Sequence, residues 1–353
     1  MRIAFVLSSI GNYGPFIVAR DIIKGIKENS EKLDVFYLKY SENALDFTAD
    51  KVTKIKFSDK IDFSDYDIIH SHGFLADAYL FYHRRQITAK RISTLHQEIK
   101  PDYSMAYGGV VGSILEKVWC RFLSKFDKIV CLSKNMVEYY SNTFDNKRLA
   151  YVYNGIENGE KSPIATSENY KNILSLKGTN KILGVSARLI FRKGIDLVIK
   201  ALEINKNKNL ILVIIGDGEE RIKLQLLAEE VGVSDRCYFV GYTSNVLPYY
   251  KLMDFYIMSS RSEAFGLCVI EAASLGIPLI CSDLPIYTEL FAENEVIRFV
   301  PNDPRSLSEA INSALLYEKD LGMKIYDKYL NNFTLAKMAE SYQKIYRGLL
   351  EKS

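Results

Sequence analysis

The chain has 353 residues, of which 48% are hydrophobic, 12% aromatic and 25% charged, with 20 Gly and 8 Pro. This average usage excludes a disordered, collagen-like or low-complexity protein, and the length suits two domains of ordinary size. The net charge is only +3, so a surface for nucleic acid is not expected.

Short apolar runs bounded by turn residues recur in the first part of the chain and predict buried parallel strands joined by helices. The expected strands are Ile3–Leu7, Asp34–Leu38, Ile68–His70, Ile92–Leu95 and Lys128–Leu132. Gly14 follows the first strand and precedes an expected helix, Phe16–Ile26, where it would let a phosphate approach the backbone. The turn lacks the G-x-G-x-x-G spacing, so a nicotinamide cofactor is not expected.

All four histidines lie in this part of the chain. His70 and His72 stand two residues apart, and we expect their rings on opposite faces of a strand and therefore no shared metal ion. Asp65 and Asp67 match a D-x-D metal motif, but they precede their strand, so we interpret them as a turn. His96 follows the strand Ile92–Leu95 at the sheet edge where open parallel sheets bind ligands, which makes it the candidate site residue here.

The segment Ser113–Lys128 predicts an amphipathic helix with a basic stripe of Lys117, Arg121 and Lys125. Two interpretations stay open. The helix packs on the core and exposes a solvated stripe, or it contacts an anionic membrane surface or a phospholipid-linked acceptor.

The strand and helix pattern restarts after a polar stretch, Glu157–Lys181, which places a domain boundary near residue 160. The second set of expected strands is Ile182–Ser186, Leu210–Gly216, Cys237–Val240, Phe255–Met258 and Pro278–Cys281. Near the end, Phe333–Leu350 has apolar and aromatic residues at helical spacing.

Two motifs in the second half suggest an anion site. Phe265, Gly266 and Leu267 follow a strand and start a helix, where backbone N–H groups favour a phosphate, while Glu271 could accept from ribose hydroxyls. Arg188 and Lys193 leave another strand end and could clamp one diphosphate. The alternatives are a helix cap with a surface carboxylate and a solvated basic loop. Gly216 and Gly218 are expected to permit a tight turn.

Taken together, these motifs resemble glycosyltransferase family four, retaining enzymes with the GT-B fold, over essentially the full length. The motifs that carry the resemblance are Glu263-x7-Glu271 with Phe265-Gly266 inside it, Ser186–Leu189 with Lys193-Gly194, Val152–Ile156 and Asp67–His72. The resemblance implies two Rossmann-like, doubly wound parallel-sheet α/β domains that face a central cleft. They would span residues 1–160, with a C-terminal helix at about 335–353 packing back, and residues 161–334.

The resemblance also implies a role for each candidate residue. Catalytic roles fall to Arg188 and Lys193, which would hold the donor diphosphate, to Glu263, and to His96 beside the sugar. Donor contacts fall to Gly14 in the N-terminal glycine loop, to Phe265, Gly266 and Leu267 at the phosphate, to Glu271 at the ribose and to Tyr242 near the nucleobase. Ala187 and Ala264 depart from the family pattern, which leaves the donor's identity open.

We therefore expect a retaining glycosyltransferase that moves a hexose or N-acetylhexosamine from a UDP-sugar to a lipid-linked or saccharide acceptor in O-antigen or capsule synthesis. No cofactor and no metal are expected. The alternatives are a GDP-sugar-dependent transferase, a GT-B epimerase or phosphorylase, or a non-catalytic binding module. Five scattered cysteines and the lack of a signal peptide or of a run of ~20 apolar residues predict a cytoplasmic protein, peripheral at the inner face of the cell membrane.

Overall fold

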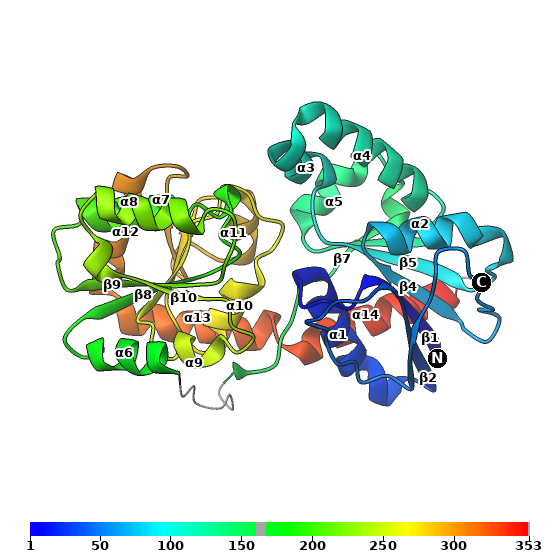
Figure 1. The fold of residues 1–353 in the computed structure, drawn as a ribbon. Helices are drawn as coiled ribbons and strands as arrows, with labels where there is room; N and C mark the ends of the chain where they lie inside the picture. Colours follow the sequence, from blue (N-terminus) through cyan, green and yellow to red (C-terminus); the bar gives the residue numbers. More distant parts are fainter. Residues whose placement is uncertain (160–166, 352–353) are drawn as a thin grey trace. The chain divides into compact units, whose positions relative to one another are not determined.

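The computed structural model describes residues 1–159 and 167–351 (Figure 1). The chain forms two compact units, one built from Met1–Ile156 with the segment that starts at Phe333, the other from Glu157–Asn332. The predicted boundary at residue 160 and the polar residues 161–163 lie outside the described residues. Each unit is an α/β domain built on one parallel sheet, as the sequence predicted.

The sheet of the first unit has seven strands in the order β3-β2-β1-β4-β5-β6-β7, and every neighbouring pair is parallel. The strands are β1 (Arg2–Ser9), β2 (Lys32–Lys39), β3 (Lys51–Lys54), β4 (Ile68–His72), β5 (Lys90–Leu95), β6 (Lys128–Cys131) and β7 (Leu149–Tyr151). The strand order reverses between β1 and β4, and ligands bind at the carboxyl ends of strands at such a switch point.

Helices cover both faces of this sheet, with α1 and α14 packed together on one of them (Figure 1). They are α1 (Gly14–Ile26), α2 (Phe74–His83), α3 (Ile99–Tyr107), α4 (Gly109–Leu123), α5 (Lys134–Ser141) and α14 (Leu335–Leu350). Gly25 allows α1 and α14 to approach closely, because a Cβ there would lie 2.7 Å from the Cβ of Ala339. The buried aromatic face of α14, with Tyr342 and Tyr346, therefore belongs to the first unit.

The sheet of the second unit has six strands in the order β10-β9-β8-β11-β12-β13, again all parallel. The strands are β8 (Lys181–Ser186), β9 (Leu210–Ile215), β10 (Cys237–Gly241), β11 (Phe255–Met258), β12 (Leu279–Ser282) and β13 (Ile297–Phe299). Here the order reverses between β8 and β11. Every residue of β9, β11 and β12 is buried, so the continuous apolar runs identified these strands.

The helices of the second unit are α6 (Glu168–Leu176), α7 (Ile195–Ile204), α8 (Arg221–Glu230), α9 (Leu247–Tyr250), α10 (Leu267–Ala273), α11 (Pro285–Leu290), α12 (Pro304–Leu316) and α13 (Glu318–Asn332). Asp303 caps α12, since its carboxylate accepts from the backbone N–H groups of Arg305 and Ser306. The helix α7 packs against α12. Their facing side chains belong to one hydrophobic core, which also includes residues of β9 and β12.

Three strands were not predicted, namely β3, β7 and β13, and each is a short strand at an edge of its sheet. Three of the four residues of β3 are exposed, and β7 and β13 have three residues each, so none carries the buried apolar run that marks a strand. The prediction of one helix over Ser113–Lys128 was wrong at both ends. The helix α4 starts at Gly109 and ends at Leu123, because Ser124 caps it and Lys128 already belongs to β6.

Candidate active site

Two loops of the second unit meet at its switch point. Arg188 and Lys193 lie in the loop that follows β8, and Ser259 to Glu263 lie in the loop that follows β11. Because β8 and β11 are neighbours in the sheet, their carboxyl ends bring the two loops together. The predicted cation motif and the predicted carboxylate motif thus form one group of side chains.

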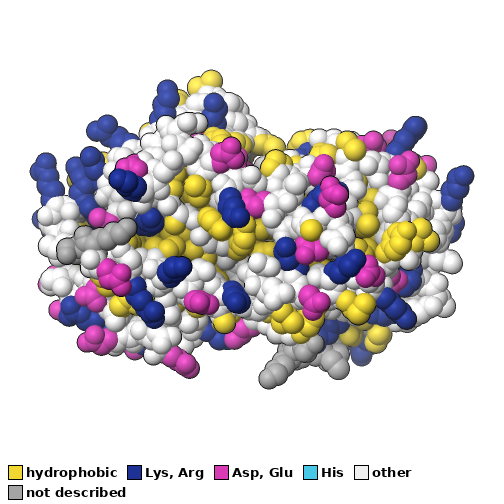
Figure 2. Space-filling model, turned by 180° about the vertical axis from the view of Figure 1, so that it is seen from behind, with side chains coloured by type: hydrophobic (Ala, Val, Ile, Leu, Met, Phe, Trp, Pro, Cys, Tyr) yellow, Lys and Arg dark blue, Asp and Glu magenta, His cyan; other side chains and the backbone are white. Residues whose placement is uncertain are grey.

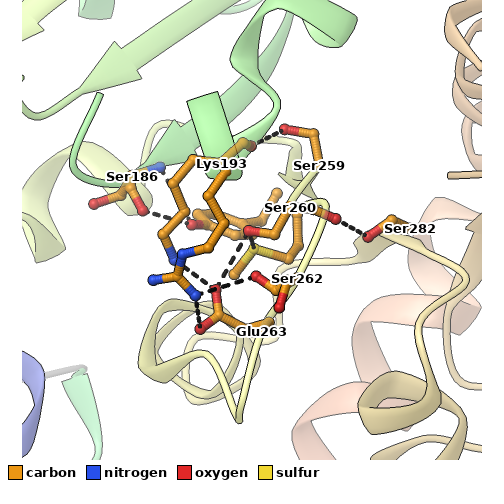
Figure 3. A network of polar contacts seen from close by, with 10 residues as sticks. Ser186, Lys193, Ser259, Ser260, Ser262, Glu263 and Ser282 are labelled. Atoms are coloured by element: carbon orange, nitrogen blue, oxygen red, sulfur yellow. Dashed lines mark hydrogen bonds and ion pairs between the residues drawn. The ribbon is translucent and has the colours of Figure 1, made fainter. Parts of the chain in front are cut away.

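The centre of this group is an ion pair between Lys193 and Glu263 (Figure 3). The Lys193 Nζ donates to Glu263 Oε2 over 2.5 Å, and the Ser260 hydroxyl donates to the same oxygen over 3.3 Å. Arg192 approaches the other carboxylate oxygen, with Nη1 at 3.9 Å from Oε1. The side chains of Lys193 and Glu263 are only 13% and 9% exposed, so water screens their attraction little.

The electrostatics of Glu263 follow from this burial. Burial by itself raises the pKa of the Glu263 carboxyl, but the charge of Lys193, followed by that of Arg192, holds the pKa below its usual value. Glu263 is therefore a fixed negative charge beside two cations, and it orients the Lys193 ammonium.

Close contacts between the two loops hold the backbone next to Lys193. Gly194 adopts φ +64°, and a Cβ at this position would lie 2.1 Å from the carbonyl oxygen of Ser259. The Ser259 hydroxyl donates to the carbonyl of Lys193 over 2.9 Å. Arg261 joins the same two loops, because its Nη1 donates to the carbonyl of Phe191 over 2.6 Å. Its Nη1 and Nη2 also lie 2.9 and 2.8 Å from the two carboxylate oxygens of Asp196 in α7. Side-chain and backbone contacts together fix the loops before any ligand binds.

Arg188 has a different environment from Lys193. Its side chain is exposed, and within residues 1–159 and 167–351 it makes no hydrogen bond or ion pair. The loop that carries it rests on Gly216 and Gly218. A Cβ on Gly216 would lie 1.9 Å from the Ala187 carbonyl oxygen, and one on Gly218 would lie 2.4 Å from that of Leu189. We expected these glycines only to permit a tight turn, but their close contacts also position the loop that carries Arg188.

The remaining donor-site candidates of this unit lie around α10 and β10. Gly266 caps α10 in the left-handed region, with φ +86°, between buried Phe265 and half-buried Leu267. Glu271 lies in the fifth position of this seven-residue helix, and its Oε2 accepts from the Tyr250 hydroxyl over 3.0 Å. Tyr242 directly follows β10 and is 56% exposed.

Gly14 and His96 belong to the first unit, where Gly14 comes after β1 at the switch point and His96 follows β5, the neighbour of β4. Gly14 is the first residue of α1, is exposed, and has no atom within 4 Å of the position of a Cβ. His96 lines a cavity of about 190 Å³. The walls of the cavity are largely aromatic, and its polar lining groups come from Ser8, Thr94, His96 and Gln97. The aromatic walls are Phe16, Phe74, Tyr103 and Trp119.

The expected placement of His70 and His72 on opposite faces of their strand was wrong. Their ring centroids lie 4.5 Å apart, because side chains two residues apart in a strand point to the same face. His72 also contacts His96, with Nδ1 at 2.8 Å from the His96 Nε2. His70 is bound on both nitrogens, by the hydroxyls of Tyr346 at 2.7 Å and Thr94 at 2.8 Å. In the described part of the chain, no three His, Cys, Asp or Glu side chains come together as metal ligands.

A buried carboxylate holds one wall of the cavity in place. The Trp119 Nε1 donates to Asp77 Oδ2 over 2.7 Å, and the Ser71 hydroxyl donates to Asp77 Oδ1 over 2.5 Å. Burial raises the pKa of Asp77 to about 6, although both hydrogen bonds work against that rise. The orientation of the indole is therefore fixed by a group that the sequence did not single out.

The helices α3 and α4 carry an exposed apolar surface that the predicted core packing does not explain. We call Met105, Tyr107, Val110, Val111, Ile114 and Val118, all of them exposed, the α3–α4 patch. Lys117, Arg121 and Lys125 are exposed beside it, whereas Trp119 and Leu123 are buried. Figure 2 shows hydrophobic and basic side chains together at the top of the view, where Figure 1 places these two helices. No helix among the described residues is long and apolar enough to cross a membrane.

The chain matches two family models. Residues 31–159 match Glycosyltransferase Family 4, and residues 166–329 match Glycosyl transferases group 1. It is 32% identical to the O-antigen biosynthesis glycosyltransferase WclY of Escherichia coli, over 100% of this chain and 99% of that protein.

Solved structures are similar to the chain over almost its whole length. Anabaena Alr3699/HepE in complex with UDP and glucose has a TM-score of 0.81 at 15% identity and covers 98% of this chain and 99% of its own. The sucrose-phosphate synthase of Thermosynechococcus elongatus has a TM-score of 0.83 at 19% identity and covers 100% of both chains. With identities of only 15% and 19%, these structures are evidence for the fold of the chain and not for its activity.

Proposed function

Since the chain belongs to the family of group 1 and family 4 glycosyltransferases, we propose that it transfers a sugar from a UDP-sugar to an acceptor hydroxyl with retention of the anomeric configuration. The family expected from the motifs is confirmed, and with it a glycosyltransferase activity. The donor nucleotide, the stereochemistry and the acceptor are proposals.

The observation that carries the donor site is the pairing at the switch point of the second unit. Lys193 is held 2.5 Å from Glu263, while the exposed Arg188 has no partner in the described part of the chain. A fixed ammonium and an available guanidinium in one loop suit a diphosphate. The ammonium is a compact charge, and the planar guanidinium can donate to two phosphate oxygens at once. We assign both to the diphosphate, and Phe265, Gly266 and Leu267 to its distal phosphate.

The other donor contacts follow from this placement. Glu271 would accept from the ribose hydroxyls, and Tyr242, exposed at the end of β10, would lie against the nucleobase. In the first unit, Gly14 would give the donor phosphate room beside α1, since no atom lies within 4 Å of its Cβ position.

The proposed reaction breaks the bond between the anomeric carbon and the β-phosphate oxygen, whose electron pair stays on the phosphate. Arg188 and Lys193 neutralise the charge that develops there. The acceptor oxygen bonds to the same face of the anomeric carbon, and its proton passes to the departing phosphate. Glu263 is bound by Lys193 and Ser260, so we assign it to positioning the ammonium rather than to attack on the sugar. With these cations at the phosphate, we propose that no metal ion takes part.

The cavity of the first unit is suited to bind a sugar that takes part in the reaction. Aromatic walls and a few polar groups are the usual lining of a sugar or ligand site. We propose that a sugar ring packs against Trp119 and Phe74, and that His96 contacts one of its hydroxyls.

The α3–α4 patch supports a lipid-linked acceptor. Exposed apolar residues such as Val110 and Ile114, with Lys117 and Arg121 alongside, suit the surface of an anionic membrane. Each basic side chain near such a surface contributes about 1 kcal/mol. We propose that the enzyme works at the inner face of the cell membrane in O-antigen synthesis, in keeping with the name of its Escherichia coli relative.

Vesicle sedimentation tests the membrane contact. We expect binding to phosphatidylglycerol vesicles and none to phosphatidylcholine vesicles, and we expect Ile114→Glu to abolish it. Leu226→Glu, at a residue of α8 that is as exposed as Ile114, should bind as the native protein does. Equal binding by both variants would contradict the proposal.

Product analysis tests the reaction. Purified protein is incubated with UDP-glucose, UDP-galactose or UDP-N-acetylglucosamine and with lipid-linked saccharides extracted from bacterial membranes. We expect one of these donors to yield a product with the donor's own anomeric configuration, unaffected by EDTA. Inversion would refute the proposed stereochemistry, turnover of GDP-sugars alone would refute the donor, and a modified nucleotide sugar formed without acceptor would favour an epimerase.

A further inference from the structure

Trp119, in the wall of the first unit's cavity, is held by a carboxylate that does not itself line the cavity. The indole Nε1 donates to Asp77 Oδ2 over 2.7 Å, and the Ser71 hydroxyl donates to Asp77 Oδ1 over 2.5 Å. Asp77 and Ser71 are fully buried, and Trp119 is only 6% exposed. An indole nitrogen can only donate, so the bond between Trp119 and Asp77 has one possible direction.

This bond uses the only polar group of the indole. What Trp119 can offer to the cavity is therefore apolar ring surface. Phe74 extends that surface, since its ring packs edge to face against the indole, with 5.2 Å between the centroids and an angle of 79°. A sugar ring has C–H groups on its faces and hydroxyls around its rim. Its faces suit these aromatic walls, and its hydroxyls suit the polar lining groups such as His96 and Gln97.

We propose that Asp77 is a positioning residue for saccharide binding, because it accepts the indole N–H and so holds the apolar surface of Trp119 toward the sugar. The sugar in this statement rests on the proposed function. Asp77 lies in the first turn of α2, three residues after Phe74. The helix α4, which carries Trp119, packs against α2. One helix thus supplies both a wall of the cavity and the group that fixes the neighbouring wall.

Packing alone does not require a carboxylate at this position. Burial of a charged group is unfavourable, so an apolar side chain would fill the same space at less cost. Ser71 does not need the carboxylate either, because its hydroxyl also lies 3.2 Å from the carbonyl oxygen of Ile92. Among the described residues, by contrast, the Trp119 Nε1 bonds no acceptor other than Asp77. Without that acceptor the indole would bury an unpaired donor, and we expect the ring to turn.

The indole can be observed without signal assignment, since Trp119 is the single tryptophan of the chain. The ¹H–¹⁵N spectrum of the full-length protein gives one indole N–H signal. We expect it to exchange slowly with solvent in the native protein and in Asp77→Asn, which keeps an oxygen that can accept. Asp77→Leu removes both oxygens, so its indole signal should exchange fast or split. A signal in Asp77→Leu as protected as the native one would overturn the proposal.

Sugar binding is measured on the same indole. Methyl α-glucoside, methyl α-galactoside and N-acetylglucosamine are titrated into each protein, and the fluorescence of Trp119 reports binding in the cavity. We expect at least one of them to change the native fluorescence. Its Kd should rise about two- to ten-fold in Asp77→Leu, as for the loss of an aromatic contact, and recover in Asp77→Asn. No native response to any of the three, or an equal Kd in Asp77→Leu, would overturn the proposal.

Asp34→Leu is the matched control. Asp34 is also a buried carboxylate of the first unit that accepts from an aromatic side chain, with the Tyr66 hydroxyl at 2.5 Å from its Oδ2. Neither Asp34 nor Tyr66 lines the cavity. We expect Asp34→Leu to lower the urea midpoint and to leave the indole signal and the Kd for the sugar unchanged. If it weakens the sugar as much as Asp77→Leu does, the loss reflects general loosening of the unit, and the positioning role is refuted.

Calorimetric titration with UDP keeps this inference distinct from the proposed function. UDP should bind the native protein and Asp77→Leu equally, because the assigned nucleotide contacts lie mainly in the second unit. If UDP binds none of the proteins, the proposed donor fails while the indole and sugar results stand. If UDP binds and the affinity for the sugars does not depend on Asp77, the proposed donor site stands and the positioning role fails.

Discussion

Replacing Lys193 by Met removes the ammonium from the centre of the site and keeps a side chain of similar length. Glu263 would then remain nine-tenths buried with only Ser260 at 3.3 Å and Arg192 at 3.9 Å as partners. Loss of one member of a buried ion pair costs about 3–5 kcal/mol. Because Arg192 still contributes, we expect the free energy of unfolding to fall by about 3 kcal/mol, at the lower end of that range.

The loss should depend on pH because Glu263 titrates. In the native protein its pKa is lowered, so its contribution is present above the pKa of the unfolded carboxyl and is lost as the pH falls through the folded value. In Lys193→Met the effect of burial prevails and raises that pKa. The variant is therefore most destabilised at neutral pH and approaches the native protein in acid.

Lys181→Met is a matched control. Lys181 also pairs with a carboxylate of the second unit, with Nζ at 2.6 Å from Glu318 Oε2, but its side chain is 40% exposed, and exposed pairs contribute less than about 1 kcal/mol. Urea unfolding followed by circular dichroism gives the two losses, and the fluorescence of Trp119, the single tryptophan, follows the first unit separately. Equal losses in the two variants, or a loss in Lys193→Met that does not change with pH, would refute the reasoning.

Three other substitutions test separate parts of the account. Arg188→Ala should leave the urea midpoint unchanged, since the side chain has no partner in the described structure, and should weaken UDP at least ten-fold in a calorimetric titration; a shifted midpoint would show a structural role. Gly194→Ala should cost at least about 1 kcal/mol because its φ is +64° and the new Cβ would meet the Ser259 carbonyl, whereas Gly348→Ala, in an open position on α14, should not destabilise. Burial raises the pKa of Asp77 to about 6, so the free energy of unfolding of the native protein should fall by up to about 3 kcal/mol as the pH rises from about 4 to 6. Urea titrations of Asp77→Asn should not show this pH dependence. An unchanged pH dependence would mean that Asp77 does not titrate in this range.

Local patterns in the sequence were sufficient for every strand except the short edge strands β3, β7 and β13, and for the carboxylate and cation motifs. Continuous apolar runs such as Phe255–Met258 are buried on both faces of a parallel sheet, so they identify strands and also the loops at their carboxyl ends. The pairing of Lys193 with Glu263 did not follow from the sequence, because 70 residues separate them and only the order of the strands brings their loops together.

The contacts that the sequence missed depend on packing between distant segments. Gly216 was assigned to a turn, yet its lack of a Cβ admits the Ala187 carbonyl. His72 was placed on the wrong face, which hid its bond to His96. The exposure of Ile114 in a helix whose Trp119 is buried depends on how α4 packs against α2 and α3, and a helical period alone gives no such orientation.

Titration calorimetry with UDP tests the central claim, that the switch point of the second unit binds a nucleoside diphosphate through Arg188 and Lys193. Hydrogen bonds to charged groups contribute about 1.5–3 kcal/mol, or roughly ten- to hundred-fold in affinity. We predict that UDP binds and that GDP, ADP and NAD bind at least ten-fold more weakly. We also predict that Arg188→Ala binds UDP at least ten-fold more weakly than the native protein, while Lys181→Met binds it equally. Absence of UDP binding, or equal binding by Arg188→Ala and the native protein, would contradict the account.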